Sequence, residues 1–172
     1  MGCWTSIERF AIDADADWQA QLVQSDGSEF ILKHQGRSLG IVRWALLGRH
    51  NVMNALAAFA ACHAVGVDVT AIIPAMLDFI SVKRRMEVIG SVRGITVYDD
   101  FAHHPTAIKT TLAGLRAKVG SQTIHAILEP RSNTMKMGVH KATLLDSLAG
   151  ADEVYLFEPK QLDWSLQQAA QD

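Results

Sequence analysis

Two acidic residues followed by two histidines form the densest group of reactive side chains in the sequence. Asp99 and Asp100 end an apolar run, and His103 and His104 precede Pro105. Open α/β sheets bind ligands where a strand ends beside a helix N-terminus, so a carboxylate here could accept hydrogen bonds from a ribose. Asp and His also bind divalent ions, which leaves a small metal-dependent phosphoesterase as an alternative. A polar turn is the simplest interpretation, but four such residues within six positions favour a site.

The second group is Gly-Arg-His-Asn-Val-Met-Asn-Ala, residues 48–55. Asn51 and Asn54 lie three apart at an expected helix start, so their carboxamides project from one face. A carboxamide offers a donor and an acceptor, which suits the edge of an adenine ring. The simpler interpretation is that Asn51 caps the helix.

Two basic segments complete the candidates. Lys83-Arg84-Arg85 could hold phosphate oxygens, because guanidinium binds them in a bidentate way; a solvated linker is the alternative. Glu-Pro-Arg-Ser-Asn-Thr-Met-Lys, residues 129–136, follows an apolar strand and is too polar for a core. Its cations could bind carboxylates, or it could be a solvated loop. The sequence contains no G-x-x-x-x-G-K-[ST], so these residues do not encode a complete phosphate-binding loop.

The first half of the chain must position the asparagines. Partial alternation between turn signals predicts a β-meander over residues 1–47, with strands at 18–24, 29–34 and 38–46. Helical spacing predicts helices over 51–65 and 71–80, the second capped by Thr70. Residues 81–85 have no apolar period and are the expected boundary.

The second half must position the other groups. Strands are expected at 86–89, 95–98, 123–128 and 154–157, and helices at 105–119, 141–149 and 162–171. Pro105 suits a first helical position, and Gly120 suits the position after a helix end. Apolar strands separated by helices predict a parallel sheet with helices on its faces.

Composition excludes several classes of protein. Of 172 residues, 16 are basic and 18 acidic, which gives a net charge of −2 and argues against a nucleic-acid or membrane partner. The longest apolar stretch, near residues 55–65, is too short and interrupted to span a bilayer. Residues 1–9 do not resemble a signal peptide. Only Cys3 and Cys62 are present, far apart, which favours a reduced, cytoplasmic protein.

Taken in this order, the four groups resemble the Mur ligases, the ATP-dependent amide-forming enzymes of bacterial cell-wall synthesis, over about residues 40–167. In that family the 48–55 motif lies on the adenine side of ATP, an arginine like Arg85 reaches phosphate, and an aspartate like Asp100 contacts the ribose region. The resemblance therefore implies cofactor binding by His50, Asn51, Asn54, Arg85 and Asp100, and catalytic roles for Arg85, Asp100 and His104.

The residues of two of these motifs indicate one branch of the family. Asp-Asp-x-x-His-His-Pro resembles the members that use UDP-N-acetylmuramate, and residues 129–136 resemble those that join it to L-Ala-γ-D-Glu-meso-diaminopimelate in peptidoglycan recycling. The resemblance implies that Arg131, Ser132, Asn133 and Lys136 bind the tripeptide. It also implies ATP, Mg²⁺ held mostly by residues outside this chain, and an acyl phosphate of the lactoyl carboxylate attacked by the tripeptide amine. UDP-N-acetylmuramate–L-alanine ligase is the alternative within the family.

The resemblance also implies a fold and two domains. Residues 1–82 would be the last part of the central ATP-binding domain, a β-meander plus helices, and residues 83–172 an incomplete Rossmann-like C-terminal domain. The family's Walker loop, metal-holding glutamate and histidine, and modified lysine belong upstream of residue 1. We therefore expect a missing ATP-binding domain as partner, and no catalysis by this chain alone.

Overall fold

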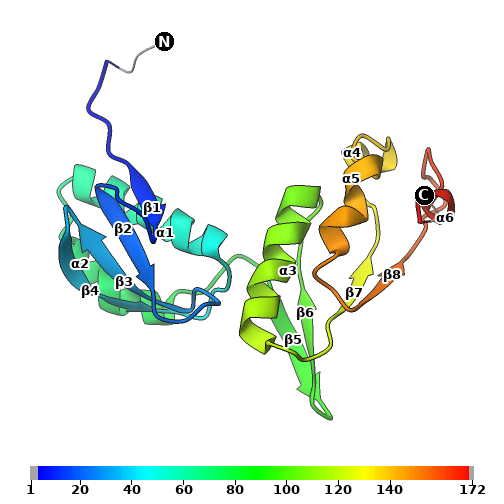
Figure 1. Ribbon diagram of the computed structural model, residues 1–172, viewed down its shortest axis with the longest axis horizontal. Coiled ribbons are helices and arrows are strands. Elements are labelled where there is room, and N and C mark those ends of the chain that lie inside the picture. The colour runs from blue at the N-terminus through cyan, green and yellow to red at the C-terminus, as the bar shows by residue number, and fades with distance from the viewer. Residues whose placement is uncertain (1–3, 171–172) are drawn as a thin grey trace. The chain divides into compact units, whose positions relative to one another are not determined.

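The computed structural model describes residues 4–170 and divides into two compact units between Ser81 and Val82 (Figure 1). Each unit has its own core, and each is described separately below. No helix in the described part of the chain is both long and apolar enough to cross a membrane.

The first unit contains a four-stranded sheet in the order β1-β2-β3-β4. Its elements are β1 (Phe10–Ile12), β2 (Trp18–Leu22), β3 (Glu29–His34), β4 (Arg37–Arg43), α1 (Arg49–Ala64), α2 (Val69–Ile72) and the 3₁₀ helix η1 (Ile73–Asp78). Strands β2, β3 and β4 pair antiparallel and form the predicted meander. The sequence did not predict β1, which pairs in parallel with β2 across the connection of residues 13–17, where Asp13 takes a φ of 56°.

Helix α1 packs its apolar stripe against this sheet. Val52, Leu56 and Phe59 are buried at the spacing that the sequence predicted for one helix face. From the sheet, Trp18, Phe30, Leu32 and Val42 are fully buried in the same core. Burying each such side chain contributes about 1.5–3 kcal/mol, so this core holds the first unit together.

Two predictions about helix starts in this unit were wrong. Asn51 does not cap α1: the cap is Gly48, at φ 89°, and Asn51 lies inside the first turn, where its Nδ2 donates to the Leu47 carbonyl at 2.7 Å. Thr70 does not cap the next helix either, because Asp68 accepts its N–H at 3.0 Å. The expected helix over 71–80 becomes α2 followed by η1, because Pro74 has no N–H to continue the α-helical pattern.

The second unit contains two separate two-stranded sheets. Its elements are β5 (Glu87–Val92), β6 (Ile95–Asp99), α3 (Pro105–Val119), β7 (His125–Leu128), α4 (Asn133–Lys136), α5 (Lys141–Leu144), the 3₁₀ helix η2 (Asp146–Leu148), β8 (Glu153–Leu156) and α6 (Leu166–Ala169). Helix α3 has the predicted bounds and is followed by Gly120. Strands β7 and β8 pair in parallel, as predicted, whereas β5 and β6 form an antiparallel hairpin of their own.

Local chemistry accounts for the other differences. Strand β5 runs on to Val92, because Arg93 and Gly94 both take positive φ and close a two-residue hairpin turn. The expected helix over 141–149 is broken after α5, where the Ser147 hydroxyl donates to the Leu144 carbonyl at 2.5 Å. The expected helix over 162–171 begins only at α6, because Ser165 caps it there; residue 171 lies outside the described residues.

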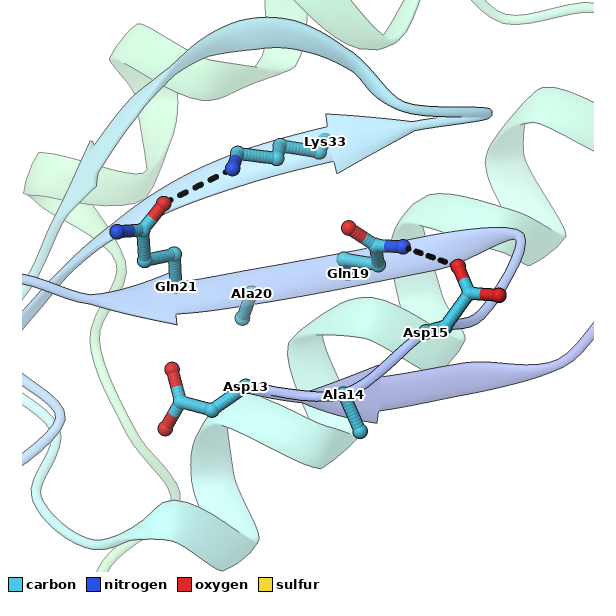
Figure 2. A pocket seen from close by; sticks show the side chains of 7 residues that line it. All are labelled: Asp13, Ala14, Asp15, Gln19, Ala20, Gln21 and Lys33. Atoms are coloured by element: carbon cyan, nitrogen blue, oxygen red, sulfur yellow. Dashed lines mark hydrogen bonds between the residues drawn. The ribbon is translucent and has the colours of Figure 1, made fainter.

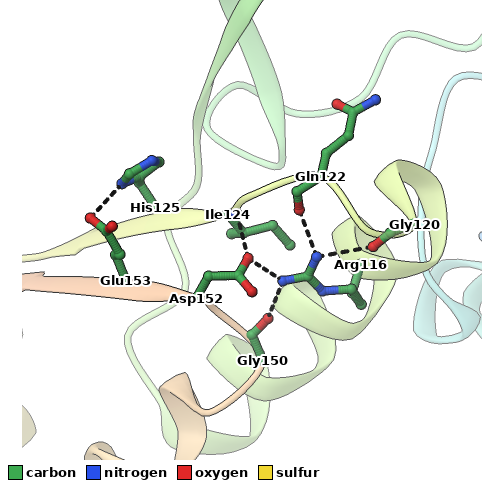
Figure 3. Close-up of polar contacts among 8 residues, drawn as sticks. All are labelled: Arg116, Gly120, Gln122, Ile124, His125, Gly150, Asp152 and Glu153. Atoms are coloured by element: carbon green, nitrogen blue, oxygen red, sulfur yellow. Dashed lines mark hydrogen bonds and ion pairs between the residues drawn. The ribbon is translucent and has the colours of Figure 1, made fainter.

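An arginine–aspartate contact joins α3 to the start of β7 and β8 (Figure 3). The Arg116 guanidinium donates to Asp152 at 2.5 Å and to the carbonyls of Gly120 and Gln122. Asp152 also accepts the Ile124 N–H at 2.7 Å. This backbone hydrogen bond, followed by the one from Arg116, lowers the pKa of Asp152. The contact therefore fixes the ends of both parallel strands on the helix.

Candidate functional site

Asp100 lies directly after β6, and both of its carboxylate oxygens hold backbone amides. Oδ2 accepts the Met86 N–H at 2.9 Å, and Oδ1 accepts the Ala102 N–H at 2.7 Å. Asp100 therefore fixes the segment before β5 to the segment that leads into α3. An ionised carboxylate has about four acceptor positions, so two remain for a ligand.

The basic segment is folded into a tight turn beside Asp100. The Arg84 carbonyl accepts the Phe101 N–H at 2.7 Å, and the Arg84 side chain pairs with Asp99 at 3.1 Å. Arg84 and Met86 take φ values of 60° and 50°, which side chains other than glycine rarely adopt. Arg85, between them, is exposed, and its guanidinium carbon lies 5.9 Å from the centre of the Phe101 ring. The turn thus presents Arg85 to solvent on a restrained backbone.

The two histidines that follow serve the start of α3. His104 caps this helix, because its Nδ1 accepts the Thr106 N–H at 3.2 Å. Nδ1 of His103 lies 3.0 Å from the Phe101 carbonyl oxygen. Among the described residues, Asp99, Asp100 and these two histidines do not converge as a metal-ligand cluster. The structure therefore gives no support to a phosphoesterase built on them.

The loop over 129–136 is held by helix α4. Ser132 caps this helix by accepting the Met135 N–H at 3.3 Å, and the Met135 carbonyl accepts the Trp164 indole N–H at 2.7 Å. Arg131 and Asn133 are exposed, and Arg131 lies 3.6 Å from Glu129. Lys136 is half-buried at the end of the helix. Helix α4 is thus held in place, and the exposed Arg131 precedes it, with Glu129 3.6 Å away.

His140 connects this loop to the start of α3. Its ring lies edge-on to His104, with ring centres 4.4 Å apart. The contact brings the residues after α4 beside the segment that contains Asp100. Sequence reasoning missed His140, because nothing in its neighbours indicates a partner 36 positions away. It also missed Phe101, although Phe101 stands between Asp100 and His103 in the motif.

The asparagine motif lies in the first unit. His50 and Asn51 are half-buried, and Asn54 is exposed on the first turns of α1. The preceding Arg49 pairs with Asp13 at 3.1 Å, a contact that the sequence did not reveal. Because Arg85 and Asp100 belong to the second unit, joint nucleotide binding by the two groups stays a prediction.

The first unit also has an open depression of about 520 Å³ that contains none of the predicted site residues (Figure 2). It is lined by Asp13, Ala14, Asp15, Gln19, Ala20, Gln21 and Lys33. Its polar side chains bind one another: Lys33 donates to Gln21 at 2.9 Å, and Gln19 donates to Asp15 at 3.1 Å (Figure 2). It therefore offers few groups to a ligand.

Two families of domains match the chain, one in each unit. The Mur ligase middle domain matches residues 4–62, and the glutamate ligase domain of Mur ligases matches residues 84–172. The second match covers half of the chain. The matches lie on either side of the division between the two units.

Individual relatives agree with these matches. Two relatives are UDP-N-acetylmuramate–L-alanyl-γ-D-glutamyl-meso-2,6-diaminoheptandioate ligases. The one from Haemophilus influenzae is 48% identical to this chain over 96% of this chain and 36% of its own length. The one from Escherichia coli is 47% identical over 99% of this chain and 37% of its own length. A UDP-N-acetylmuramate–L-alanine ligase of Roseiflexus castenholzii is 42% identical over 67% of this chain and 26% of its own length.

Solved structures show the same likeness. A murein peptide ligase of Psychrobacter arcticus superposes with a TM-score of 0.66 at 45% identity, and covers 99% of this chain and 36% of its own. The chain thus spans little more than a third of the length of the first two curated relatives.

Proposed function

Since this chain belongs to the Mur ligase family, we propose that it is part of an ATP-dependent ligase that joins UDP-N-acetylmuramate to L-Ala-γ-D-Glu-meso-diaminopimelate in peptidoglycan recycling. The observation that carries the proposal is an identity of 47–48% to ligases of that name over nearly the whole chain. The match to the L-alanine-adding ligase covers less of the chain, at lower identity, which makes that activity the second candidate. A cytoplasmic location fits a protein with two widely separated cysteines.

The proposed reaction has two steps. The lactoyl carboxylate of UDP-N-acetylmuramate attacks the γ-phosphorus of ATP, and ADP leaves with the electrons of the broken P–O bond. The amine of the tripeptide then attacks the acyl phosphate, which forms the amide and releases phosphate and the amine proton. Both steps bring anions together, so they need positively charged groups in fixed positions.

Arg85 is the group in this chain best suited to the phosphates. It is exposed, held on a restrained turn, and has a planar guanidinium that binds phosphate oxygens in pairs. Asp100 holds that turn through the Met86 amide and keeps two acceptor positions for a ribose hydroxyl. His50, Asn51 and Asn54, which belong to the first unit, are the residues proposed to contact adenine.

Mg²⁺, which the family implies, does not fit the carboxylates beside these residues. Asp99 pairs with Arg84, and both oxygens of Asp100 bind backbone amides. Mg²⁺ prefers an octahedral set of oxygen ligands, including free carboxylates. We therefore place no Mg²⁺ on Asp99, and we assign the two open acceptor positions of Asp100 to the ribose.

The 131–136 loop would receive the tripeptide. It starts at the carboxyl end of a parallel strand, where α/β domains bind ligands. Arg131 is exposed, and its guanidinium can bind a carboxylate of the diaminopimelate end. Ser132 is already engaged as a helix cap, so Asn133 and Lys136 are the better candidates for the remaining polar contacts.

A chimeric enzyme tests the proposed substrate. The segment of the E. coli relative that matches this chain would be replaced by the 172 residues, and ATP-dependent product formation measured with the tripeptide and with L-alanine. We expect the chimera to use the tripeptide and to leave L-alanine unused. Preference for L-alanine in a folded chimera would establish the second candidate instead.

Variants of the same chimera test the nucleotide residues. Asp100→Ala should lower turnover by about two or more orders of magnitude, because the Arg85 turn loses its anchor and the ribose loses an acceptor. Arg85→Lys keeps the charge but loses the paired hydrogen bonds, so it should also raise the KM for ATP. Arg93→Ala, in the hairpin turn between β5 and β6, is the matched control and should change neither value. Near-normal turnover of Asp100→Ala would contradict the proposed role of Asp100 in nucleotide binding.

Arg131→Ala tests the peptide loop. Losing a charged partner in a binding site costs on the order of 2–5 kcal/mol, or roughly 30- to several-thousand-fold in affinity. We therefore expect the KM for the tripeptide to rise far more than the KM for ATP. Equal changes in the KM for the tripeptide and for ATP, or no change in either, would show that the loop is a solvated turn that does not bind the peptide.

A further inference from the structure

Three side chains that no part of the proposed reaction uses meet in the first unit. Glu8 precedes β1, His34 ends β3, and His63 lies in the last turn of α1. One ligand atom from each, a carboxylate oxygen and two imidazole nitrogens, lies within 4.8 Å of the other two. The three come from segments far apart in the sequence, so the fold itself brings them together.

Trp18 holds two of these side chains in place. Its ring stacks on His34, with centres 4.0 Å apart and planes 17° from parallel, and its indole N–H donates to Oε2 of Glu8 at 2.8 Å. Trp18 is fully buried and faces His34 across the β2–β3 ladder, so this platform is rigid. The ring centre of His63 lies 4.7 Å from that of His34 and 5.4 Å from that of Trp18.

The backbone beside Glu8 is fixed as well. The Arg9 N–H donates to the Asp17 carboxylate at 2.8 Å, and the Arg9 carbonyl accepts the Trp18 N–H at 2.9 Å. Both backbone groups of Arg9 are therefore bound, which restrains the backbone of the adjacent Glu8 beside the sheet. The Glu8 side chain is exposed to solvent.

His34 has a polar atom that the protein leaves unsatisfied. Its Nε2 is buried and has no hydrogen-bond partner among the described residues. A buried polar atom without a partner costs about 1–3 kcal/mol, so native proteins rarely retain one without a reason. A bound cation at this position would satisfy it.

From this arrangement we infer that Glu8, His34 and His63 form a binding site for a zinc-type divalent cation. Two imidazole nitrogens and one carboxylate oxygen match the three-ligand sets of Zn²⁺, whereas Mg²⁺ and Ca²⁺ prefer oxygen ligands alone. Zinc bonds of about 2.0–2.2 Å place tetrahedral ligands about 3.4 Å apart. The three ligand atoms lie within 4.8 Å of one another, so side-chain rotations that shorten these separations by up to about 1.4 Å close the site. The fourth position is left for water. The Trp18–Glu8 hydrogen bond is an outer contact of the kind that orients metal ligands.

Such an ion would join the segment before β1 to the sheet and to the end of α1. The site uses none of the residues proposed to bind nucleotide or peptide, so it stands or falls independently of the ligase proposal.

Calorimetric titration of the purified, chelator-treated chain with ZnCl₂ tests the site, with MgCl₂ titrated in parallel. We expect one Zn²⁺ per chain and no saturable Mg²⁺ binding. Zinc should also raise the unfolding temperature, because it binds only where the three ligands are brought together. Absence of stoichiometric Zn²⁺ binding would overturn the inference.

Matched variants locate the ion. Glu8→Gln keeps an acceptor for Trp18 but loses the anionic ligand, and His63→Gln changes an exposed position at a helix end; each should weaken Zn²⁺ binding at least tenfold. His125→Gln, in the second unit, and Cys62→Ser, next to His63 in sequence, should bind as the parent does. Unchanged affinity in Glu8→Gln, or loss of binding in Cys62→Ser, would overturn the assignment. If His63→Gln does not fold, Glu8→Gln alone decides it.

Discussion

The two units differ in how much of their sheets is buried in a core. In the first unit, alternate residues of the sheet and one stripe of α1 meet in a continuous core that includes the fully buried Trp18, Phe30 and Leu56. In the second unit, every residue of β5 is exposed, and the core lies between α3, β7 and the short helices that follow. Asp100, His104 and Ser132 each bind backbone amides there.

The difference shows how a site can be ordered where little apolar surface is buried. A carboxylate, imidazole or hydroxyl that accepts a backbone N–H fixes its own orientation and the segment that it binds. The second unit relies on such bonds around the proposed nucleotide and peptide contacts. The variants below should therefore act globally in the first unit and locally in the second.

The largest effect is expected from the cores. Leu56→Ala and Leu144→Ala remove matched, fully buried side chains from the first and second core. Such changes cost about 2–5 kcal/mol, more where the surroundings cannot collapse. We expect the loss of stability to lie near the upper end of this range for Leu56→Ala and near the lower end for Leu144→Ala. Hydrogen exchange, resolved for each unit, would measure both losses. The reverse order would contradict the comparison.

The next effect is local and concerns the turn before β5. Asp100→Ala removes the acceptor for Met86 and Ala102, so trypsin should cut after Lys83, Arg84 or Arg85 faster than in the parent. Asp99→Ala is the control, because it loses only the pairing with the Arg84 side chain. Similar cutting rates for both variants would show that the backbone hydrogen bonds of Asp100 do not hold the turn.

A smaller effect depends on pH and compares one aspartate from each unit. Hydrogen bonds from the Ile124 N–H and Arg116 lower the pKa of Asp152, and those from the Thr70 hydroxyl and N–H lower the pKa of Asp68. A carboxylate with a lowered pKa adds stability above its unfolded pKa of about 3.9, and this stability is lost as the pH falls through the folded value. Asp152→Asn should therefore flatten the acid-side loss of stability in the second unit only, and Asp68→Asn in the first unit only. Hydrogen exchange measured from about pH 7 to 3 would check this, and an effect of either variant on both units would contradict it.

The smallest effect is expected at the start of α3. His104→Ala removes the ring nitrogen that caps the helix, which should cost roughly 0.5–1 kcal/mol. His104→Asn restores a cap and should recover that stability, as judged by denaturant unfolding. It does not restore the ring contact with His140, so ligase turnover in the chimera separates capping from catalysis.

Regular patterns in the sequence were enough to predict much of this fold. The spacing of Val52, Leu56 and Phe59 predicted the buried face of α1, and Pro105 and Gly120 predicted both ends of α3. The meander and the parallel pairing of β7 with β8 were confirmed, and the domain matches confirm the predicted fold class. In each case a repeated or terminal signal acts over many residues.

Features that depend on one side chain or on distant partners were not predictable. The expected helix over 141–149 changes to a 3₁₀ helix after α5, where the Ser147 hydroxyl donates to the Leu144 carbonyl. The β5–β6 pair forms its own hairpin because two consecutive residues take positive φ. For the candidate site, the sequence named Arg85 and Asp100 but not the amides that Asp100 binds or the ring of His140, since those contacts exist only once the chain has folded.

The parallel pairing of β7 with β8 has a consequence for how the second unit folds. Strand β8 follows β7 only after residues 129–152, so the two strands cannot pair until this long segment has folded back. Hairpins such as β2–β3 and β5–β6 bring neighbouring residues together and form early, whereas contacts across long separations slow folding. The segment between the two strands contains Arg131 and Lys136. The residues proposed to recognise the peptide would thus take their final positions only once this long-range pairing has formed.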